Sequence, residues 1–217
     1  MRAVLAALCV AALSAGAALA ATGEKEQINL TKVDQAAARR AVVARTDLTS
    51  GTWTGGFSKP NLSQTPGCAN FHPKQADLVL TGAAESHWSA NGLQLNTVAQ
   101  VLRTKAMVAA DWRRTVLANG AIPCLRARLL KDLGQGVTFI SFKRIVFAPV
   151  ATNVQAFLML VDVKTSATKK VRIAVEFVVI AERRTELTVV SLAQNAVQNV
   201  VAQIDAQLAR QIVARAV

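Results

Sequence analysis

Alternating apolar and polar positions dominate the second half of the chain and predict β-strands there. The expected strands cover residues 136–147, 154–164, 171–181 and 186–192. Short polar turns separate them, so consecutive strands should pair antiparallel, as a meander. Because the segment 154–164 is apolar on both sides, both faces of the resulting sheet need a cover.

A second pair of strands is predicted earlier in the chain. Residues 76–89 and 93–103 flank Ala90-Asn91-Gly92. An Asn-Gly pair between alternating segments is the strongest short sequence signal for a tight hairpin, because both residues tolerate positive φ. We therefore expect a two-stranded hairpin ahead of the meander.

Helical spacing of apolar residues predicts helices at both ends and in the middle of the chain. They are expected over 31–46, 105–117, 122–133 and 194–217. Thr31 and Thr104 are suited to cap the first two. The predicted apolar stripe of the first helix is Val33, Ala37, Ala41 and Ala44, and that of the last is Val197, Val200, Val201, Ile204, Leu208 and Ile212.

This order of elements predicts an α+β fold. We expect a single twisted antiparallel β-sheet packed by N-terminal, central and C-terminal helices, all laid on one face. Residues 31–217 should form this single domain, and residues 21–30 a flexible lead-in. The second face would be covered by loops, by bending of the sheet, or by a cavity that takes an apolar ligand.

Residues 1–20 have the pattern of a secretory signal peptide. Arg2 gives a positive start, residues 3–19 are apolar, and Ala18-Leu19-Ala20 matches a small-x-small cleavage site. We predict export to the cell envelope or medium, and no stable membrane span after cleavage. An uncleaved anchor is the alternative, although the segment is slightly short for a bilayer span.

Cleavage would remove Cys9 and leave Cys68 and Cys124. A lone pair of cysteines in an oxidising compartment is expected to form a disulfide, with two free thiols as the alternative. The pair lacks the C-x-x-C spacing of a redox site. No metal site is predicted, because His72 and His87 lack the spacing and the neighbouring ligands that zinc requires.

The chain is strongly basic, with 25 Lys and Arg against 13 Asp and Glu and a formal net charge of +12. Basic residues occur as scattered pairs: Arg39-Arg40, Arg113-Arg114, Lys143-Arg144, Lys169-Lys170 and Arg183-Arg184. This charge favours contact with an anionic envelope or membrane surface. Nucleic-acid binding is not predicted, because a dense basic stripe with stacking aromatics is missing.

No catalytic motif stands out, and we predict neither an enzyme nor a cofactor. There is no G-x-S-x-G, and the glycine-containing segment 47–56 lacks the ending of a phosphate-binding loop. The carboxylates considered for an acid–base pair have no telling spacing: Asp77, Glu85, Asp111, Asp162, Glu176 and Glu182.

Four aromatic residues are the candidate ligand contacts. They are Trp53, Trp88, Trp112 and Phe157. For Trp53 and Trp112 a place in the apolar core is the favoured interpretation, and ligand contact the alternative.

Several short motifs together resemble the extracellular sensor domains of mycobacterial-type Ser/Thr kinases. They are Asp47-Leu48-Thr49-Ser50-Gly51-Thr52-Trp53, Cys68, Ala99-Gln100-Val101, Trp112, Cys124 and Arg183-Arg184-Thr185, between two Ala/Arg helices. The resemblance implies an α+β, disulfide-bonded domain with a cleft for a ligand. Thr49 replaces the proline of that family's entry motif, and only one of its usual two disulfides is possible. Neither a kinase nor a transmembrane segment accompanies these motifs, so no signalling role follows.

Two functions remain as hypotheses. The first is an exported, non-catalytic envelope protein that binds a small apolar or anionic ligand in a cleft between sheet and helices. The alternative is a protein- or cell-wall-interaction module that uses a basic face. A deep apolar pocket would favour the first, and a flat basic patch the second. A buried carboxylate facing another titratable group in a cleft would instead favour an enzyme.

Overall fold

The structure is a computed structural model that describes residues 26–48, 51–62, 68, 70–194 and 197–217. The predicted signal peptide, residues 1–20, lies outside the described residues. Its presence, the predicted export and the limits of the domain therefore stay predictions.

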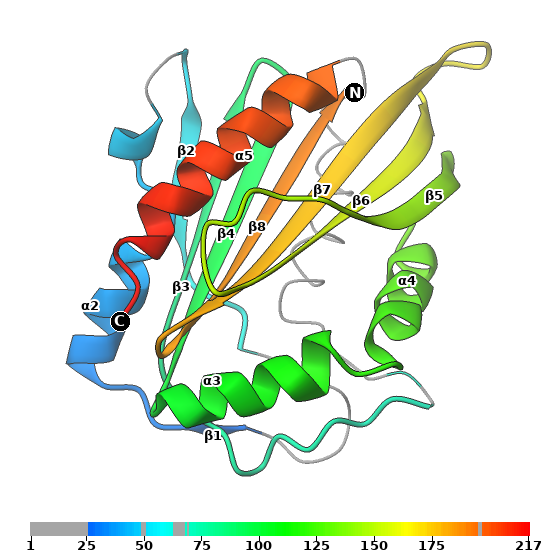
Figure 1. Cartoon of the computed structure of the whole chain (residues 1–217). Coiled ribbons are helices and arrows are strands. Elements are labelled where there is room, and N and C mark those ends of the chain that lie inside the picture. The colour runs from blue at the N-terminus through cyan, green and yellow to red at the C-terminus, as the bar shows by residue number, and fades with distance from the viewer. Residues whose placement is uncertain (1–25, 49–50, 63–67, 69, 195–196) are drawn as a thin grey trace.

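Eight strands form one mixed sheet (Figure 1). They are β1 Gln27–Ile28, β2 Thr54–Ser58, β3 Val79–Ala90, β4 Leu93–Leu102, β5 Val137–Ile145, β6 Asn153–Lys164, β7 Lys170–Glu182 and β8 Thr185–Gln194. The strand order is β1-β3-β4-β8-β7-β6-β5, and β2 also pairs with β3. The six predicted strands are confirmed, and β5 to β8 form the expected antiparallel meander.

The predicted hairpin is β3 and β4, with Asn91 at φ 48° and Gly92 at φ 81°. Positive φ at both residues is what a tight turn between twisted strands requires. β4 then pairs antiparallel with β8, from Gln94 with Leu192 to Val101 with Thr185. The hairpin and the meander thereby become one continuous sheet.

One strand pair is parallel, which corrects the prediction of a purely antiparallel sheet. β2 covers the edge of β3 only over Glu85–Ser89. On the remaining edge β1 pairs parallel with Val79 and Leu80, and the Gln27 N–H donates to the Leu78 carbonyl at 3.0 Å. Gln27–Ile28 therefore belong to the sheet, although the sequence predicted a flexible lead-in there.

The helices are α2 Lys32–Arg40, α3 Lys105–Asp111, α4 Ala121–Lys131 and α5 Gln198–Val213. Both predicted caps are confirmed, since Thr31 and Thr104 each accept a hydrogen bond from a backbone N–H of the first turn. α3 continues as a π-helical turn, Trp112–Val116, and Arg45–Asp47 form a 3₁₀ turn. No helix of the described residues is long and apolar enough to cross a membrane.

Helices cover both faces of the sheet, which corrects the prediction that all lie on one. Strand β7 shows why, because Val178 and Ile180 join the core beneath α2 and α5, whereas Val175 and Phe177 join the core beneath α4. α3 adds a third cluster, around Trp112, on the α4 side. Figure 1 shows α5 crossing the strands, away from α3 and α4.

The buried side of α5 differs from its predicted stripe. Val197 and Val200 are exposed by 46% and 57%. The buried side chains are Val201, Asp205, Leu208, Ala209 and Ile212, which places a carboxylic acid in the middle of the stripe. Val33 of α2 is likewise exposed, by 76%, whereas the predicted Ala37 and Ala41 are buried, together with Ala38.

The predicted disulfide is confirmed between Cys68 and Cys124, whose Cα atoms are 5.5 Å apart. It joins the loop before β3 to the first turn of α4. Phe71 and Ala121 are buried around it. The crosslink therefore fixes α4 to the rest of the chain on the side where the sheet needs a cover.

We predict that Gly82→Ala strongly destabilises the protein. A Cβ atom at Gly82 would overlap the carbonyl oxygen of Asp34, because α2 approaches β3 closely there. Such overpacking against backbone should lower the free energy of unfolding by about 2–3 kcal/mol, measured by chemical denaturation. Gly134→Ala, where a Cβ atom meets nothing within 4 Å, is the control and should unfold like the wild type.

Candidate functional site

Two of the four candidate ligand contacts lie on the α5 side of the sheet. Trp88 is buried, and its indole N–H donates to the Val43 carbonyl at 3.0 Å. Trp53 is partly buried and packs against the same cluster. Both side chains therefore support the connection between β3 and the segment that follows α2.

The other two candidates lie on the opposite side of the sheet and in different clusters. Trp112 is buried beside Leu80 and Leu102. Phe157 is 2% exposed, and its ring stacks on Phe142 with centroids 5.6 Å apart. The structure does not bring the four aromatics together, and their role in ligand binding stays a prediction.

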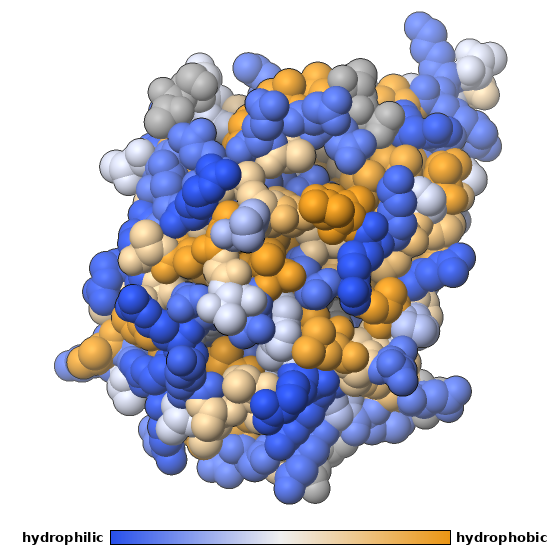
Figure 2. Space-filling view, in the orientation of Figure 1, coloured by the Kyte–Doolittle hydropathy of each residue, from blue (hydrophilic) through white to orange (hydrophobic). Residues whose placement is uncertain are grey.

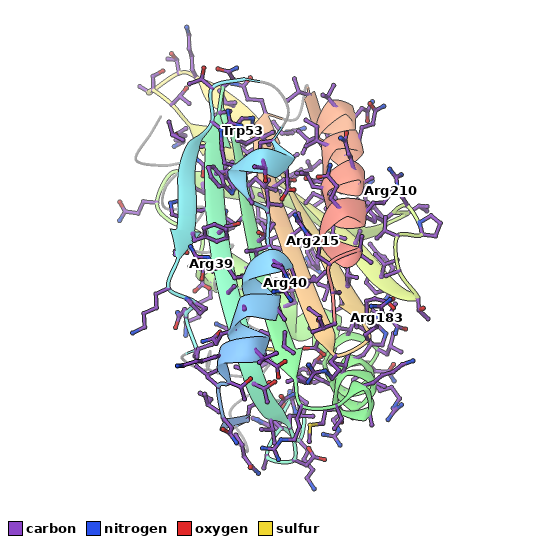
Figure 3. All side chains as sticks on the ribbon, turned by 90° about the vertical axis from the view of Figure 1, so that its left-hand side faces the viewer. Arg39, Arg40, Trp53, Arg183, Arg210 and Arg215 are labelled. Carbon is purple, nitrogen blue, oxygen red and sulfur yellow. A yellow bond between two sulfur atoms is a disulfide. The ribbon has the colours of Figure 1, made fainter. Side chains whose placement is uncertain are left out.

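Several arginines lie on the side of the molecule that α2 and α5 form, spread across that side (Figure 3). We define the arginine face by five exposed side chains, Arg39, Arg40, Arg45, Arg183 and Arg210. They come from α2, the 3₁₀ turn, the β7–β8 turn and α5. Segments far apart in the sequence thus place positive charge on one side of the molecule.

Two ion pairs hold this face together. The Arg184 guanidinium donates to both oxygens of Asp34, at 2.7 and 3.3 Å, and so joins the β7–β8 turn to α2. The Arg215 guanidinium donates to both oxygens of Asp47, at 2.9 Å each, and so joins the end of α5 to the 3₁₀ turn. Bidentate pairs of this kind fix orientation as well as distance.

The C-terminal end of α5 is tied to the same turn. The Arg184 N–H and the Thr185 hydroxyl both donate to the Val217 carbonyl. The Arg183 guanidinium donates to the Ala216 carbonyl at 3.3 Å, from a residue with φ 53°. These bonds keep Arg183 beside the last turn of α5.

Local contacts also orient two other exposed arginines. The guanidinium of Arg39 lies 4.3 Å from the centre of the Phe57 ring, which is 41% exposed. Arg45 donates to the Leu48 carbonyl at 2.8 Å. Both side chains still reach solvent, so their positive charges stay available to an anion.

A first group of buried carboxyls consists of Asp111, Glu186 and Glu26. Gln75 donates to Asp111 at 2.7 Å, and Asp111 also hydrogen-bonds Glu186. Desolvation raises the pKa of Asp111, and raises that of Glu186 further because Asp111 stands beside it. Burial likewise raises the pKa of Glu26 to about 7, with repulsion from Asp111 as a smaller cause.

A second group lies under α5, where burial raises the pKa of Glu176 to about 7 and that of Asp205 to about 8. Sequence spacing suggested no carboxyl pair, and neither group was identified from it. Only one signal was present: Glu176 interrupts the otherwise apolar run 173–181 of β7, and Asp205 interrupts an apolar helix stripe.

The remaining acids are mostly paired. Four arginines bind one aspartate each, namely Asp34, Asp47, Asp77 and Asp162. Burial raises the pKa of five more carboxyls, so at mildly acidic pH they contribute less negative charge than the formal net charge of +12 assumes. On the arginine face, Asp34 and Asp47 are paired and Asp205 is buried.

Figure 2 shows a different surface, the one that faces the reader in Figure 1. Apolar side chains gather there in its middle, below α5, with hydrophilic residues around them. Val146, in the segment after β5, is fully exposed. Across the described part of the chain, no three His, Cys, Asp or Glu side chains converge to hold a metal ion.

Comparison with solved structures gives a weak likeness to an extracellular domain. The extracellular domain of PknH from Mycobacterium tuberculosis is 9% identical to this chain, with a TM-score of 0.46. The match covers 83% of this chain and 95% of that one. It agrees with the weak resemblance found in the sequence, and says nothing of function. No protein-family model and no curated protein matches the chain.

We predict that Arg184→Met destabilises the protein by about 1 kcal/mol, because it leaves the 10%-exposed Asp34 carboxylate without its partner. The arginine lowers the pKa of Asp34, so the loss should be largest at neutral pH and shrink as acid protonates that carboxyl. Urea denaturation at several pH values measures it. Arg172→Met, in the more exposed pair with Asp162, is the control and should lose much less.

Proposed function

We propose that this chain is an exported, non-catalytic interaction module of the cell envelope, and that its arginine face docks an anionic, phosphate-bearing partner. One observation carries the proposal. Five exposed arginines from four separate segments share one face, on which Asp34 and Asp47 are paired and Asp205 is buried. A positively charged face of this kind attracts anions electrostatically.

Phosphate is the anion that arginine suits best. The guanidinium group is planar, always charged, and presents donors in a fork that matches two phosphate oxygens. Arg39, Arg45 and Arg183 are held by contacts that leave them exposed, so less side-chain freedom is lost when they bind. A repeated phosphate array would engage several of them together.

A phospholipid surface is the partner that we favour. Exposed apolar side chains lie on or beside the elements of the arginine face: Val33 on α2, Val200 on α5, and Phe57 on β2, whose ring lies under Arg39. Basic and apolar side chains on the same elements are typical of proteins that bind anionic membrane surfaces.

The cleft for a small ligand, which was the first hypothesis from the sequence, is the alternative. Its support was the predicted export, the disulfide and strands that are apolar on both faces, with four aromatic side chains as candidate contacts. Trp112 and Phe157 lie on the side of the sheet opposite to Trp88, in separate clusters. The arginine face therefore has the stronger support.

We predict that replacing Arg39, Arg40 and Arg210 together by glutamine weakens binding to vesicles of phosphatidylglycerol. Each basic residue near an anionic surface contributes about 1 kcal/mol, so losing three should weaken binding on the order of a hundredfold. Vesicle co-sedimentation at low and moderate salt measures it, and salt should weaken wild-type binding.

The matched control removes the same number of charges at the β6–β7 hairpin, as Lys164→Gln, Lys169→Gln and Lys170→Gln. This variant should bind nearly as well as the wild type. Equal losses in both variants, or equal binding to neutral phosphatidylcholine vesicles, would overturn the proposal. Binding to soluble polyphosphate but not to vesicles would identify a polymer instead of a lipid surface.

A further inference from the structure

The contact between α5 and the sheet contains two facing carboxylic acids. Asp205, in the middle of the buried side of α5, is 1% exposed, and Glu176 on β7 is 2% exposed. The Ser191 hydroxyl lies 2.5 Å from one oxygen of Asp205. Among the residues that the structure describes, the other Asp205 oxygen and both oxygens of Glu176 have no hydrogen-bond partner.

The surroundings of the pair are apolar. Across the strands, Glu176 pairs with Leu158 on β6 and with Ser191 on β8. Ser191 in turn pairs with Leu95 on β4, which is buried. These neighbours cannot hydrate a carboxylate, and only Ser191 offers it a hydrogen bond.

The charged groups near the pair supply no counterion. Lys143 on β5 ends the same cross-strand row, but it is exposed and separated from Glu176 by Leu158. The Arg172 guanidinium on β7 binds Asp162. The segment 146–152 has no titratable side chain. On α5 itself Arg210 is exposed.

This geometry sets the sign of the pH dependence. Burial raises the pKa of Glu176 to about 7, and burial together with the charge of Glu176 raises that of Asp205 to about 8. Because both values lie above those of an unfolded chain, the stabilising contribution is complete at acidic pH. It is lost as pH rises through about 7 and 8, where two unpaired charges form in the core.

The two ends of α5 are held differently. The C-terminal end has the Val217 bonds to the β7–β8 turn and the ion pair of Arg215 with Asp47. The N-terminal half depends on the buried stripe that includes Asp205, and Val200 beside it is exposed. The free-energy cost of ionising buried Asp205 therefore acts on the N-terminal half of α5, which fewer bonds hold to the sheet.

We propose that Glu176 and Asp205 form a pH-dependent latch, which keeps the N-terminal half of α5 on the sheet at mildly acidic pH and releases it at alkaline pH. The latch does not depend on the proposed docking function. Its release would uncover apolar side chains of β7 and β8, while the C-terminal end of α5 stays attached.

Hydrogen–deuterium exchange of the whole protein at pH 6 and pH 9, corrected for the intrinsic pH dependence of exchange, tests the latch. Protection of residues 198–209 should fall by roughly tenfold or more at pH 9, and more than that of residues 210–217 or of β8. Asp205→Asn keeps a neutral group at this position and should abolish most of the fall. Asp162→Asn, in an exposed ion pair, should keep it.

Three results would overturn the proposal. Protection of 198–209 could be independent of pH, the fall could persist in Asp205→Asn, or it could be equal throughout the sheet, which would mean global destabilisation. Glu176→Gln is a second variant, should Asp205→Asn not fold, and it should reduce the fall as well. Vesicle binding is a separate readout, so failure of the latch and failure of the docking face are distinguishable.

Discussion

The burial of β7 on both of its sides is the constraint on which the rest of the structure depends. Val178 and Ile180 face one helix layer, and Val175 and Phe177 face the other. A strand of this kind is stable only if both faces of the sheet are covered. α5 and α2 supply one cover, and α4 supplies the other, fixed in place by the Cys68–Cys124 bond.

The same burial shapes the electrostatics. β7 places Glu176 in the buried interface between the sheet and α5, and Asp205 of α5 lies near it there. Desolvation favours the neutral form of both groups, so they do not balance the arginines of the surface. The positive surface and the buried acids are therefore two consequences of one packing arrangement. As pH rises, the buried acids ionise and the net positive charge of the protein falls.

The sequence predicted the strands well, because period-two alternation reports the local geometry of each strand directly. It predicted the layers less well, since a helical stripe such as that of α5 indicates a buried side but not which sheet face it meets. The two-residue strand β1 is too short to have any pattern. Glu176, Ser191 and Asp205 could not be grouped before the register of β7 with β8 was known.

In two tandem pairs, one arginine binds an aspartate while its neighbour stays at the surface. In Arg183-Arg184, the second residue binds Asp34 across 150 positions of sequence, while the first stays exposed. Arg113-Arg114 repeats this arrangement, with Arg114 bound to Asp77. In both pairs one arginine fixes a segment to its neighbour, and the other is thereby positioned at the surface. Pairs that look dispersed in the sequence can thus build a structure and present charge at the same time.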